Sequence, residues 1–349
     1  MLEIYKQKKI FVTGHTGFKG SWLGAMLNAL GAEYTGFALA PHTTPSHYTL
    51  LPSAKTSVLA DLADAMLLQK SMQDAQPEIV FHLAAQPLVR ASYKTPVYTY
   101  QTNVIGTLNV LEAIKNCPSV KAVVIITTDK VYENQEWDYP YRENDALGGY
   151  DMYSSSKACA EILVNSYKRS FFSESDRKIL IATARAGNVI GGGDWSEDRL
   201  IPDIVKATAL NQPVFIRNPK SIRPWQHVLD CLYGYLLLGE KLLEGKSEFA
   251  KPWNFSPHII DTKTVAEVVE IAGKSWNQIQ IEFGKVAEDF HEAGVLKLDN
   301  SQTLAQLQWK PVWNTETAIE KTIDWYKQFY TNERILSRQQ IEGFLETVG

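Results

Sequence analysis

The residues with the clearest chemical potential are a tyrosine and a lysine four positions apart. Tyr153 and Lys157 belong to the stretch Tyr-Ser-Ser-Ser-Lys, and this spacing places both side chains on one face of a helix. A free tyrosine has a pKa of about 10 and is a poor base at neutral pH. A neighbouring ammonium group favours the phenolate. The pair can therefore take a proton from a hydroxyl group during a reaction.

A second polar group follows an apolar run upstream of this pair. Residues 122–126 (Ala-Val-Val-Ile-Ile) predict a fully buried strand, and Thr128, Asp129 and Lys130 come just after it. Ligands of open parallel sheets bind beyond the carboxyl ends of the strands. We therefore expect these three side chains to face the same ligand as the tyrosine and lysine, with the threonine hydroxyl bonded to the reacting oxygen.

Three glycines near the N-terminus predict a phosphate-binding turn. Gly14, Gly17 and Gly20 stand between the apolar run 10–12 and a segment with helical periodicity. This order brings backbone N–H groups and a helix N-terminus to one point, where a pyrophosphate can bind. Gly14 allows the tight turn, Gly17 lets the phosphates approach, and Gly20 lets the helix pack closely.

The elements that must position these residues alternate between strand and helix. We expect an α/β fold, a Rossmann-type doubly wound parallel sheet with a smaller C-terminal substrate-binding lobe. Residues 1–186 are expected to form the dinucleotide-binding domain with the catalytic residues. Residues 187–349 are expected to form mainly the substrate lobe, with the chain returning in part to the first domain. The predicted strands are 10–12, 33–39, 57–62, 78–85, 122–126, 179–185 and 253–256, with a loop over 42–56 and an amphipathic helix after residue 330.

The end of the second predicted strand carries no clear cofactor signal. NAD enzymes often have an acidic residue there, whereas an arginine nearby suits the 2′-phosphate of NADP. Here the strand ends in Leu39-Ala40-Pro41-His42, and Glu33 stands at its start, where we expect a surface charge. The pattern favours NAD and leaves NADP open.

Three strings carry a resemblance to a known family. They are Thr-Gly-His-Thr-Gly-Phe-Lys-Gly-Ser-Trp at 13–22, Thr-Asp-Lys-Val-Tyr at 128–132 and Arg-Ala-Gly-Asn-Val-Ile-Gly-Gly-Gly-Asp-Trp at 185–195. Over residues 5–330 the chain resembles the extended short-chain dehydrogenases/reductases, which act on nucleotide sugars. Within that superfamily it resembles the 4,6-dehydratases of cytidine diphosphate sugars, which supply deoxysugars, for instance for bacterial surface polysaccharide such as lipopolysaccharide O-antigen.

The resemblance implies a bound NAD and a nucleotide-sugar substrate. The residues implied to bind the cofactor are Gly14, Gly17, Phe18, Gly20, Asp61, Leu62, Ala84, Tyr153 and Lys157. Asp61 would contact the adenine, although it could instead only cap the next helix. Asn103 would support the active site, or be an ordinary polar helix residue. Substrate-binding residues are implied at Asn188, Arg199, Arg223 and, more weakly, Arg217.

The resemblance also implies roles in the elimination of water. Thr128, Tyr153 and Lys157 would serve oxidation at C4 of the sugar, and Asp129 would protonate the departing 6-hydroxyl. Lys130 stands where relatives that act on dTDP-glucose have a glutamate that removes the C5 proton. Lys130 could be that base, could stabilise an enolate while another group acts, or could be a solvated side chain.

Charge, hydropathy and cysteine spacing limit the classes of protein to which the chain can belong. A net charge of −4 gives no bias toward nucleic acid, and no apolar run approaches the length of a membrane span. Cys117, Cys159 and Cys231 have neither paired nor metal-ligand spacing and are expected to be reduced core thiols. His82 has no partner spaced to help it bind a metal. Without an apolar signal at the N-terminus we expect a cytoplasmic protein.

The sequence leaves two alternative functions open, and the resemblance implies an oligomeric state. The chain could be a dehydratase of another nucleotide or a 4-epimerase, although Asp129 and Lys130 argue against the latter. It could also be a dinucleotide-sensing protein without activity, against which the retained Thr128, Tyr153 and Lys157 argue. His227 is expected to be packed rather than catalytic. The resemblance implies a homodimer or homotetramer in which helices near 99–114 and 151–168 pair between subunits.

Overall fold

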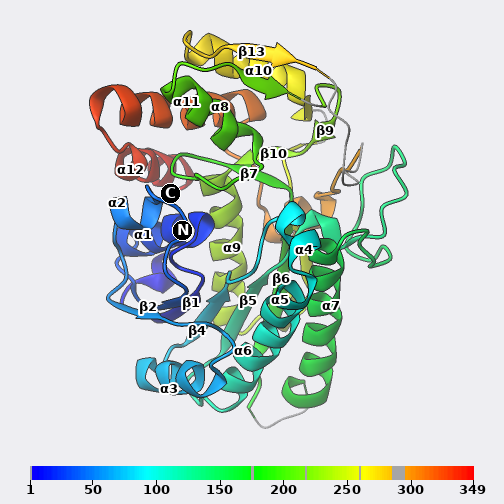
Figure 1. The fold of residues 1–349 in the computed structure, drawn as a ribbon. Helices are drawn as coiled ribbons and strands as arrows, with labels where there is room; N and C mark the ends of the chain where they lie inside the picture. The colour runs from blue at the N-terminus through cyan, green and yellow to red at the C-terminus, as the bar shows by residue number, and fades with distance from the viewer. Residues whose placement is uncertain (1, 174–176, 217, 259–260, 285–294) are drawn as a thin grey trace.

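A seven-stranded parallel sheet organises the computed structural model, which describes residues 2–173, 177–216, 218–258, 261–284 and 295–349 (Figure 1). The strand order is β11-β6-β5-β4-β1-β2-β3, so the chain reverses direction across the sheet between β1 and β4. The strands are β1 (Lys9–Thr13), β2 (Glu33–Ala38), β3 (Thr56–Leu59), β4 (Ile79–His82), β5 (Ala122–Ile126), β6 (Leu180–Ala186) and β11 (Pro252–Phe255). The predicted doubly wound parallel sheet is confirmed.

Helices cover both faces of the sheet. Because side chains alternate along each strand, each strand contributes residues to two cores. In β5, Ala122, Val124 and Ile126 point into one core, while Val123 and Ile125 point into the other. The first core is shared with α1 (Phe18–Ala29) and α9 (Val228–Leu243). The second is shared with α3 (Ala65–Ala75), α6 (Gly106–Lys115) and α7 (Met152–Tyr167). The near-continuous apolar runs of the strands reflect this burial on two faces.

The later part of the chain builds a smaller lobe and also returns to the sheet. Figure 1 shows α8, α10, α11 and β13 together beyond one end of the sheet, whereas α9 and β11 lie against and within it. The elements outside the sheet are β7 (Asn188–Ile190), α8 (Leu200–Ala209), β8 (Val214–Ile216), β9 (Ile222–Arg223), β10 (Trp225–His227), β12 (Lys263–Thr264), α10 (Val265–Ser275), β13 (Ile281–Phe283) and α11 (Thr315–Asn332).

Several local expectations need correction. The predicted loop 42–56 contains a short helix, α2 (His47–Leu50), because the Ser46 hydroxyl accepts the backbone N–H of Thr49 and caps it. Strand β3 ends at Leu59, earlier than predicted. The tail helix α12 (Ser337–Val348) begins six residues later than the predicted segment and packs against α1.

A π-helical turn interrupts one long helical segment beside the sheet. Helix α5 (Pro96–Tyr100) runs through η2 (Gln101–Ile105) directly into α6. Such turns reorient side chains and are frequent at functional sites. The remaining short elements are η1 (Glu3–Tyr5), α4 (Val89–Lys94), η3 (Asp129–Val131), η4 (Lys168–Phe172), η5 (Ser247–Phe249) and η7 (Thr303–Leu307).

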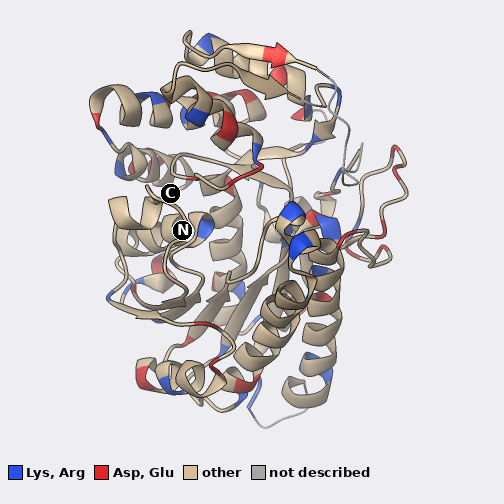
Figure 2. Cartoon of the chain, viewed as in Figure 1, with Lys and Arg blue, Asp and Glu red and all other residues tan. Residues whose placement is uncertain are grey.

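The surface charge is mixed in sign. Figure 2 shows basic and acidic residues interspersed along the helices of both lobes in this view. Glu33 is exposed and pairs with Lys55, as its predicted surface position requires. Within the ranges that the structure describes, no helix is long and apolar enough to cross a membrane.

Candidate active site

Tyr153 and Lys157 are buried on the first two turns of α7. Asp151 begins this helix by accepting the backbone N–H of Ser154 at 2.9 Å. The Lys157 ammonium donates a hydrogen bond to the carbonyl oxygen of Ile126, the last residue of β5, at 3.0 Å. Burial raises the pKa of Tyr153 to about 12, and a hydrogen bond with Thr128 opposes that rise. Burial, assisted by the charge of Lys19, lowers the pKa of Lys157 to about 8.

Thr128 and Asp129 meet this pair from the end of β5. The Thr128 hydroxyl donates to Oδ1 of Asp129 at 2.9 Å. The other carboxylate oxygen, Oδ2, is buried and has no hydrogen-bond partner among the described residues. Burial raises the pKa of Asp129, opposed by the charge of Lys130 and the hydrogen bond from Thr128. A carboxyl group in this position is suited to holding a proton and donating it to a ligand.

Lys130 lies on the short turn η3 that follows. Its side chain is half-buried, and its backbone N–H approaches the Thr128 hydroxyl at 3.4 Å. Its positive charge acts on Asp129. The structure therefore places Thr128, Asp129, Lys130, Tyr153 and Lys157 in one cluster, as the sequence predicted.

The three glycines of the turn differ in what a side chain at each position would contact. Gly14 has φ +75°, and a Cβ there would lie 2.6 Å from the backbone nitrogen of Ala84. A Cβ at Gly20 would overlap the carbonyl oxygen of Gly14. At Gly17, by contrast, a Cβ would meet protein atoms only at ordinary contact distance, 3.4 Å from the Gly14 oxygen. The open face of Gly17 thus leaves space for a ligand beside the N-terminus of α1, as a pyrophosphate requires.

The other residues predicted for the cofactor lie around the same edge of the sheet. Asp61 accepts the backbone N–H of Ala63 at 2.9 Å, whereas Asp64 is the N-cap of α3. The alternative in which Asp61 caps that helix is therefore wrong. Leu62 is buried beside Gly106. The Ala84 backbone N–H donates to the Thr13 hydroxyl at 3.2 Å, which fixes the end of β4 against β1.

The residues predicted for the substrate come from the smaller lobe. Arg199 precedes α8, donates to Asp194 at 2.9 Å, and its charge reaches Tyr153. Arg223 ends β9, and its charge acts on Asp129. Asn188 begins β7 and pairs with Trp225 of β10. Arg217 lies outside the described residues.

Lys19 is a component of the site to which the sequence argument gave no role. It is the second residue of α1, and its ammonium lies 5.9 Å from the centre of the Tyr235 ring. Burial lowers the pKa of Lys19, while Cys231 and Asp129 raise it and Arg199 lowers it. Lys19 makes no hydrogen bond or ion pair with the described part of the chain. A lysine between two phosphate-binding glycines was the available signal.

Asn103 supports the tyrosine helix from the π-helical turn η2. Its amide nitrogen donates to the Ser156 hydroxyl at 2.9 Å, and its oxygen accepts the Gln86 backbone N–H at 2.8 Å. Ser156 in turn donates to the carbonyl oxygen of Tyr153 at 2.7 Å. The buried side chain of Asn103 therefore joins the segment after β4 to the start of α7, so it is more than an ordinary polar helix residue.

A buried ion pair fixes the middle of α7, and the sequence argument missed it. Glu161 accepts hydrogen bonds from the hydroxyls of Thr127 at 2.6 Å and Thr183 at 2.7 Å, and from Nε and Nη2 of Arg185 at 3.0 and 2.9 Å. Arg185 also donates to the Tyr132 hydroxyl at 2.9 Å. One turn after Lys157, this network holds α7 against β5 and β6.

His82, His227, Cys117 and Cys231 are packed in the interior. His82 bonds Thr13 and Thr107 through its two ring nitrogens, and His227 is buried and accepts the Leu229 backbone N–H at the start of α9. Cys117 and Cys231 are buried thiols, but Cys159 is only half-buried, contrary to its predicted core position. No cluster of three or more metal-ligand side chains occurs within the described ranges.

The sequence and the fold were compared with known proteins. Residues 11–322 match the family described as GDP-mannose 4,6 dehydratase. The chain is 44% identical over 348 residues to a CDP-glucose 4,6-dehydratase from Salmonella typhimurium, covering 98% of this chain and 97% of that protein. Its fold is similar to an epimerase from Methanothermobacter thermautotrophicus, with a TM-score of 0.83, 21% identity, and coverage of 98% and 96%. It is also similar to a dTDP-glucose 4,6-dehydratase from Bacillus anthracis in complex with NAD, with a TM-score of 0.76, 22% identity, and coverage of 93% and 97%.

Proposed function

The chain belongs to the GDP-mannose 4,6 dehydratase family, and from this membership we propose that it is a CDP-glucose 4,6-dehydratase. Its product is then CDP-4-dehydro-6-deoxy-D-glucose, formed by loss of water, so the enzyme is a hydro-lyase. One observation carries the proposal: beside the Tyr153 and Lys157 pair lies a buried carboxyl group, Asp129, with one oxygen left without a partner. Such a group suits the expulsion of a hydroxyl, which an epimerase does not perform.

The residues at the carboxyl edge of the sheet fit NAD. The open face of Gly17 and the N-terminus of α1 suit the pyrophosphate, with Phe18 and the flanking Gly14 and Gly20 shaping the turn. Asp61 and Leu62 lie in the segment after β3, and Ala84 lies in the segment after β4. The adenine and the nicotinamide half of the cofactor would lie beside these segments. Bound there, NAD would supply the acceptor for the C4 hydride of the glucose and the donor that returns it to C6.

The first step is assigned to Tyr153, Thr128 and Lys157. Tyr153 takes the proton of the 4-hydroxyl, and Thr128 bonds the same oxygen as it becomes a carbonyl oxygen. Burial works against the phenolate, since it raises the pKa of Tyr153 to about 12. The hydrogen bond with Thr128 and the charge of Arg199 oppose that rise. Lys157, on the same helix face, is assigned to stabilise the negative charge that forms during proton transfer.

The second step is assigned to Asp129 and Lys130. The 4-ketone acidifies the C5 proton, and a base removes it while the 6-hydroxyl departs. Asp129 donates a proton to that hydroxyl, which its raised pKa favours. Lys130 is retained as the base or as the group that stabilises the enolate, because its side chain stands next to Asp129 and is only half-buried.

The smaller lobe supplies the proposed nucleotide-sugar contacts. Arg199 and Arg223 bring positive charge to the edge where Asp129 and Tyr153 lie, and a guanidinium fork matches two oxygens of a diphosphate. Asn188 is proposed to bond the same diphosphate, and Arg217 keeps its weaker assignment. We keep the division into residues 1–186 and 187–349, with α9 and β11 as the part that returns to the sheet.

Assembly and location are proposed on surface features. Val97, Ile105 and Ile162 are 49–68% exposed on the outer faces of α5, η2 and α7, which supports pairing of these helices in a homodimer or homotetramer. The three cysteines are free, which is typical of a reducing compartment and supports a cytoplasmic location.

Turnover of four nucleotide sugars tests the activity. The protein should convert CDP-glucose to a 4-keto-6-deoxy product and leave dTDP-, UDP- and GDP-glucose largely unchanged. Deuterium placed at C4 should reappear at C6 of the same molecule. Loss of that label to solvent, or turnover confined to another nucleotide, would contradict the proposal.

Cofactor binding is tested most cleanly at Gly17. Because the fold leaves room for a Cβ there, Gly17→Ala should keep its thermal stability yet bind NAD about 10-fold more weakly, since the methyl group lies where the phosphates approach. The matched control is Gly20→Ala, which should lose stability because its Cβ overlaps the turn. Normal NAD affinity in Gly17→Ala would argue against phosphate binding at this turn.

A further inference from the structure

The ammonium group of Lys19 is a positive charge inside the candidate active site that forms no ion pair with the described part of the chain. Lys19 is the second residue of α1, and its side chain is half-buried. Its ammonium lies 5.9 Å from the centre of the Tyr235 ring on α9. Withdrawing a charge from water without a partner costs free energy. The position of this lysine therefore calls for a role in the site.

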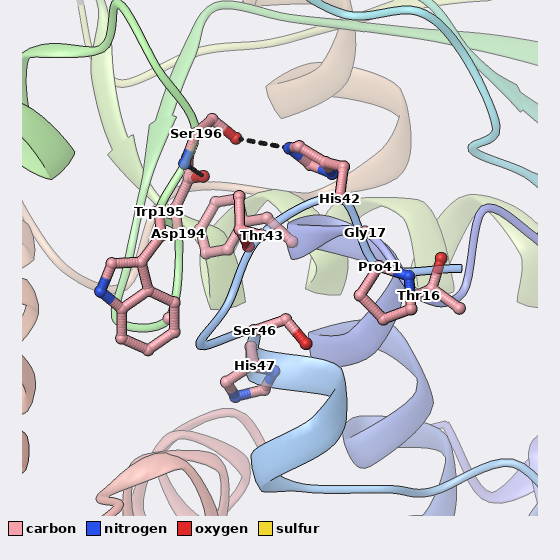
Figure 3. Close-up of a pocket in the computed structure, with 12 residues that line it drawn as sticks. Thr16, Gly17, Pro41, His42, Thr43, Ser46, His47, Asp194, Trp195 and Ser196 are labelled. Atoms are coloured by element: carbon pink, nitrogen blue, oxygen red, sulfur yellow. Dashed lines mark hydrogen bonds between the residues drawn. The ribbon is translucent and has the colours of Figure 1, made fainter. Parts of the chain in front are cut away.

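A small pocket beside the glycine turn contains no basic side chain that could share this role (Figure 3). Thr16 and Gly17 line it together with the segment after β2 and the loop around Asp194. Its volume of about 10 Å³ is room for about one water molecule. Neither lysine nor arginine occurs among the described residues that line it. Lys19 therefore points away from this pocket, toward Tyr235.

Lys19 stands between the two places that the proposed cofactor must reach. One is the open face of Gly17, which suits the pyrophosphate. The other is Tyr153, because hydride leaves the same sugar carbon whose hydroxyl Tyr153 deprotonates, and reacting atoms must lie close together. The charge of Lys19 acts on Lys157, and Tyr235, over whose ring the ammonium lies, interacts with Tyr153. The ammonium thus lies on the side of the site that the nicotinamide half must occupy.

The oxidised and the reduced nicotinamide rings differ by one positive charge. In the first step a hydride leaves C4 of the sugar with two electrons and forms a C–H bond on the ring, which becomes neutral, while the hydroxyl proton passes to Tyr153. A fixed positive charge nearby disfavours the oxidised ring and leaves the reduced ring unaffected. NAD and NADH have the same adenine, riboses and pyrophosphate, so a contact with any of these parts changes both affinities alike.

We propose that the Lys19 ammonium repels the positively charged nicotinamide ring and thereby favours binding of NADH over NAD. This inference rests on the proposed function, because it concerns the cofactor assigned there. The repulsion makes the transfer of hydride from C4 of the sugar more favourable. The same charge makes the return of hydride to C6 less favourable, so a moderate preference serves both steps.

Calorimetric titration of the full-length protein with NAD and with NADH tests the proposal, after bound nucleotide has been measured and removed. In Lys19→Met the ratio of the NAD to the NADH dissociation constant should fall about 10-fold, because only NAD is relieved of the repulsion. Lys19→Arg keeps the charge and should hold the ratio within about 3-fold of the original. The control Lys70→Met removes an exposed ammonium on α3 and should leave both constants unchanged. Thermal melting of each variant controls for folding, and Lys19→Gln is used if Lys19→Met is unstable.

The outcomes separate this proposal from the assigned activity. If Lys19→Met binds both nucleotides more weakly and the ratio stays constant, the ammonium contacts the pyrophosphate and the inference is wrong, while the dehydratase assignment stands. A constant ratio with unchanged affinities would also overturn it, because the ring would then lie beyond the reach of this charge. An equal fall of the ratio in Lys19→Arg would attribute the effect to shape and contradict the proposal. If the unaltered protein binds neither nucleotide, both the inference and the proposed function fail.

Discussion

Two polar clusters lie next to each other near the carboxyl ends of β5 and β6. The anchor cluster consists of the buried Thr127, Tyr132, Glu161, Thr183 and Arg185. The reaction cluster consists of the buried Thr128, Asp129, Tyr153 and Lys157 with the half-buried Lys19. They are neighbours in sequence, since Thr127 precedes Thr128 and Glu161 lies four residues after Lys157. Successive strand residues point to opposite faces, so adjacent threonines can serve different clusters.

The clusters differ in how completely their polar groups are paired. In the anchor cluster both oxygens of Glu161 accept two hydrogen bonds each, and the Tyr132 hydroxyl donates a hydrogen bond to Oδ1 of Asn254 at 2.7 Å. In the reaction cluster an oxygen of Asp129 has no partner among the described residues. An unpaired buried polar group costs about 1–3 kcal/mol. In the reaction cluster that oxygen of Asp129 is available to bond a ligand, whereas in the anchor cluster both oxygens of Glu161 are already occupied.

Glu161→Gln should produce the largest loss of stability. It leaves the guanidinium of Arg185, which is 2% exposed, without its counter-charge, and breaking a buried pair in this way costs about 3–5 kcal/mol. Chemical denaturation would measure the loss in unfolding free energy. The control is Asp74→Asn, which breaks the exposed pair with Lys70 and should cost less than about 0.5 kcal/mol. Equal effects would mean that burial does not distinguish the pairs.

Asp129→Asn should lower the activity strongly without lowering the stability. It removes a carboxyl group whose pKa is raised by burial, so the unfolding free energy should stay the same or rise. Product formation should fall by about 10²- to 10⁴-fold, the usual contribution of a general acid. Reduction of the bound nicotinamide on addition of CDP-glucose, followed by its absorbance, should persist. Tyr153→Phe should instead abolish that absorbance, because it blocks the earlier step. Normal turnover in Asp129→Asn would remove the carboxyl group from the dehydration step.

The sequence predicted the reaction cluster better than the anchor cluster, for a physical reason. The spacing of Tyr153 and Lys157 and their place after a buried strand are local signals, and from them we predicted that these side chains lie beside Thr128 and Asp129. The doubly wound parallel sheet followed from the alternation of apolar runs with helical segments, and its strand order became visible only in the structure. Glu161 and Arg185 are 24 positions apart and meet only because α7 packs across β6. The contact of His42 with Ser196 spans 154 positions and two lobes. Neither pairing has a signature in the local sequence.

Lys157 of the reaction cluster should make the stability of the protein depend on pH. Burial lowers the pKa of Lys157 from 10.5 to about 8, so the folded protein releases this proton before the unfolded chain does. Between these values the unfolded state binds more protons, and the free energy of unfolding therefore rises with pH. Denaturation of the cofactor-free protein near pH 8 and near pH 10 should show the unaltered protein gaining about 2 kcal/mol over Lys157→Met. A constant difference between the two proteins would mean that Lys157 is not desolvated.

The smallest expected effect concerns Lys19, the member of the reaction cluster whose role is electrostatic. Its charge lowers the pKa of Lys157 and that of Asp129, and its own ammonium contacts the Tyr235 ring rather than an anion. In Lys19→Met the pKa of both groups should rise, because a repulsion and an attraction are lost. At an effective dielectric constant of about 20, one such charge is worth about 1–2 kcal/mol, which corresponds to about a 10-fold change in the rate of the first step.

The informative measurement for Lys19 is a pH profile of single-turnover nicotinamide reduction rather than a single rate. The limb that reports Lys157 should move to higher pH in Lys19→Met and return toward its original position in Lys19→Arg, which restores the charge. A purely structural role would lower the rate at every pH and leave the limb where it was. If Lys19→Arg behaves like Lys19→Met, shape rather than charge matters at this position. Lys19 would then belong with the packed residues of α1 instead of the reaction cluster.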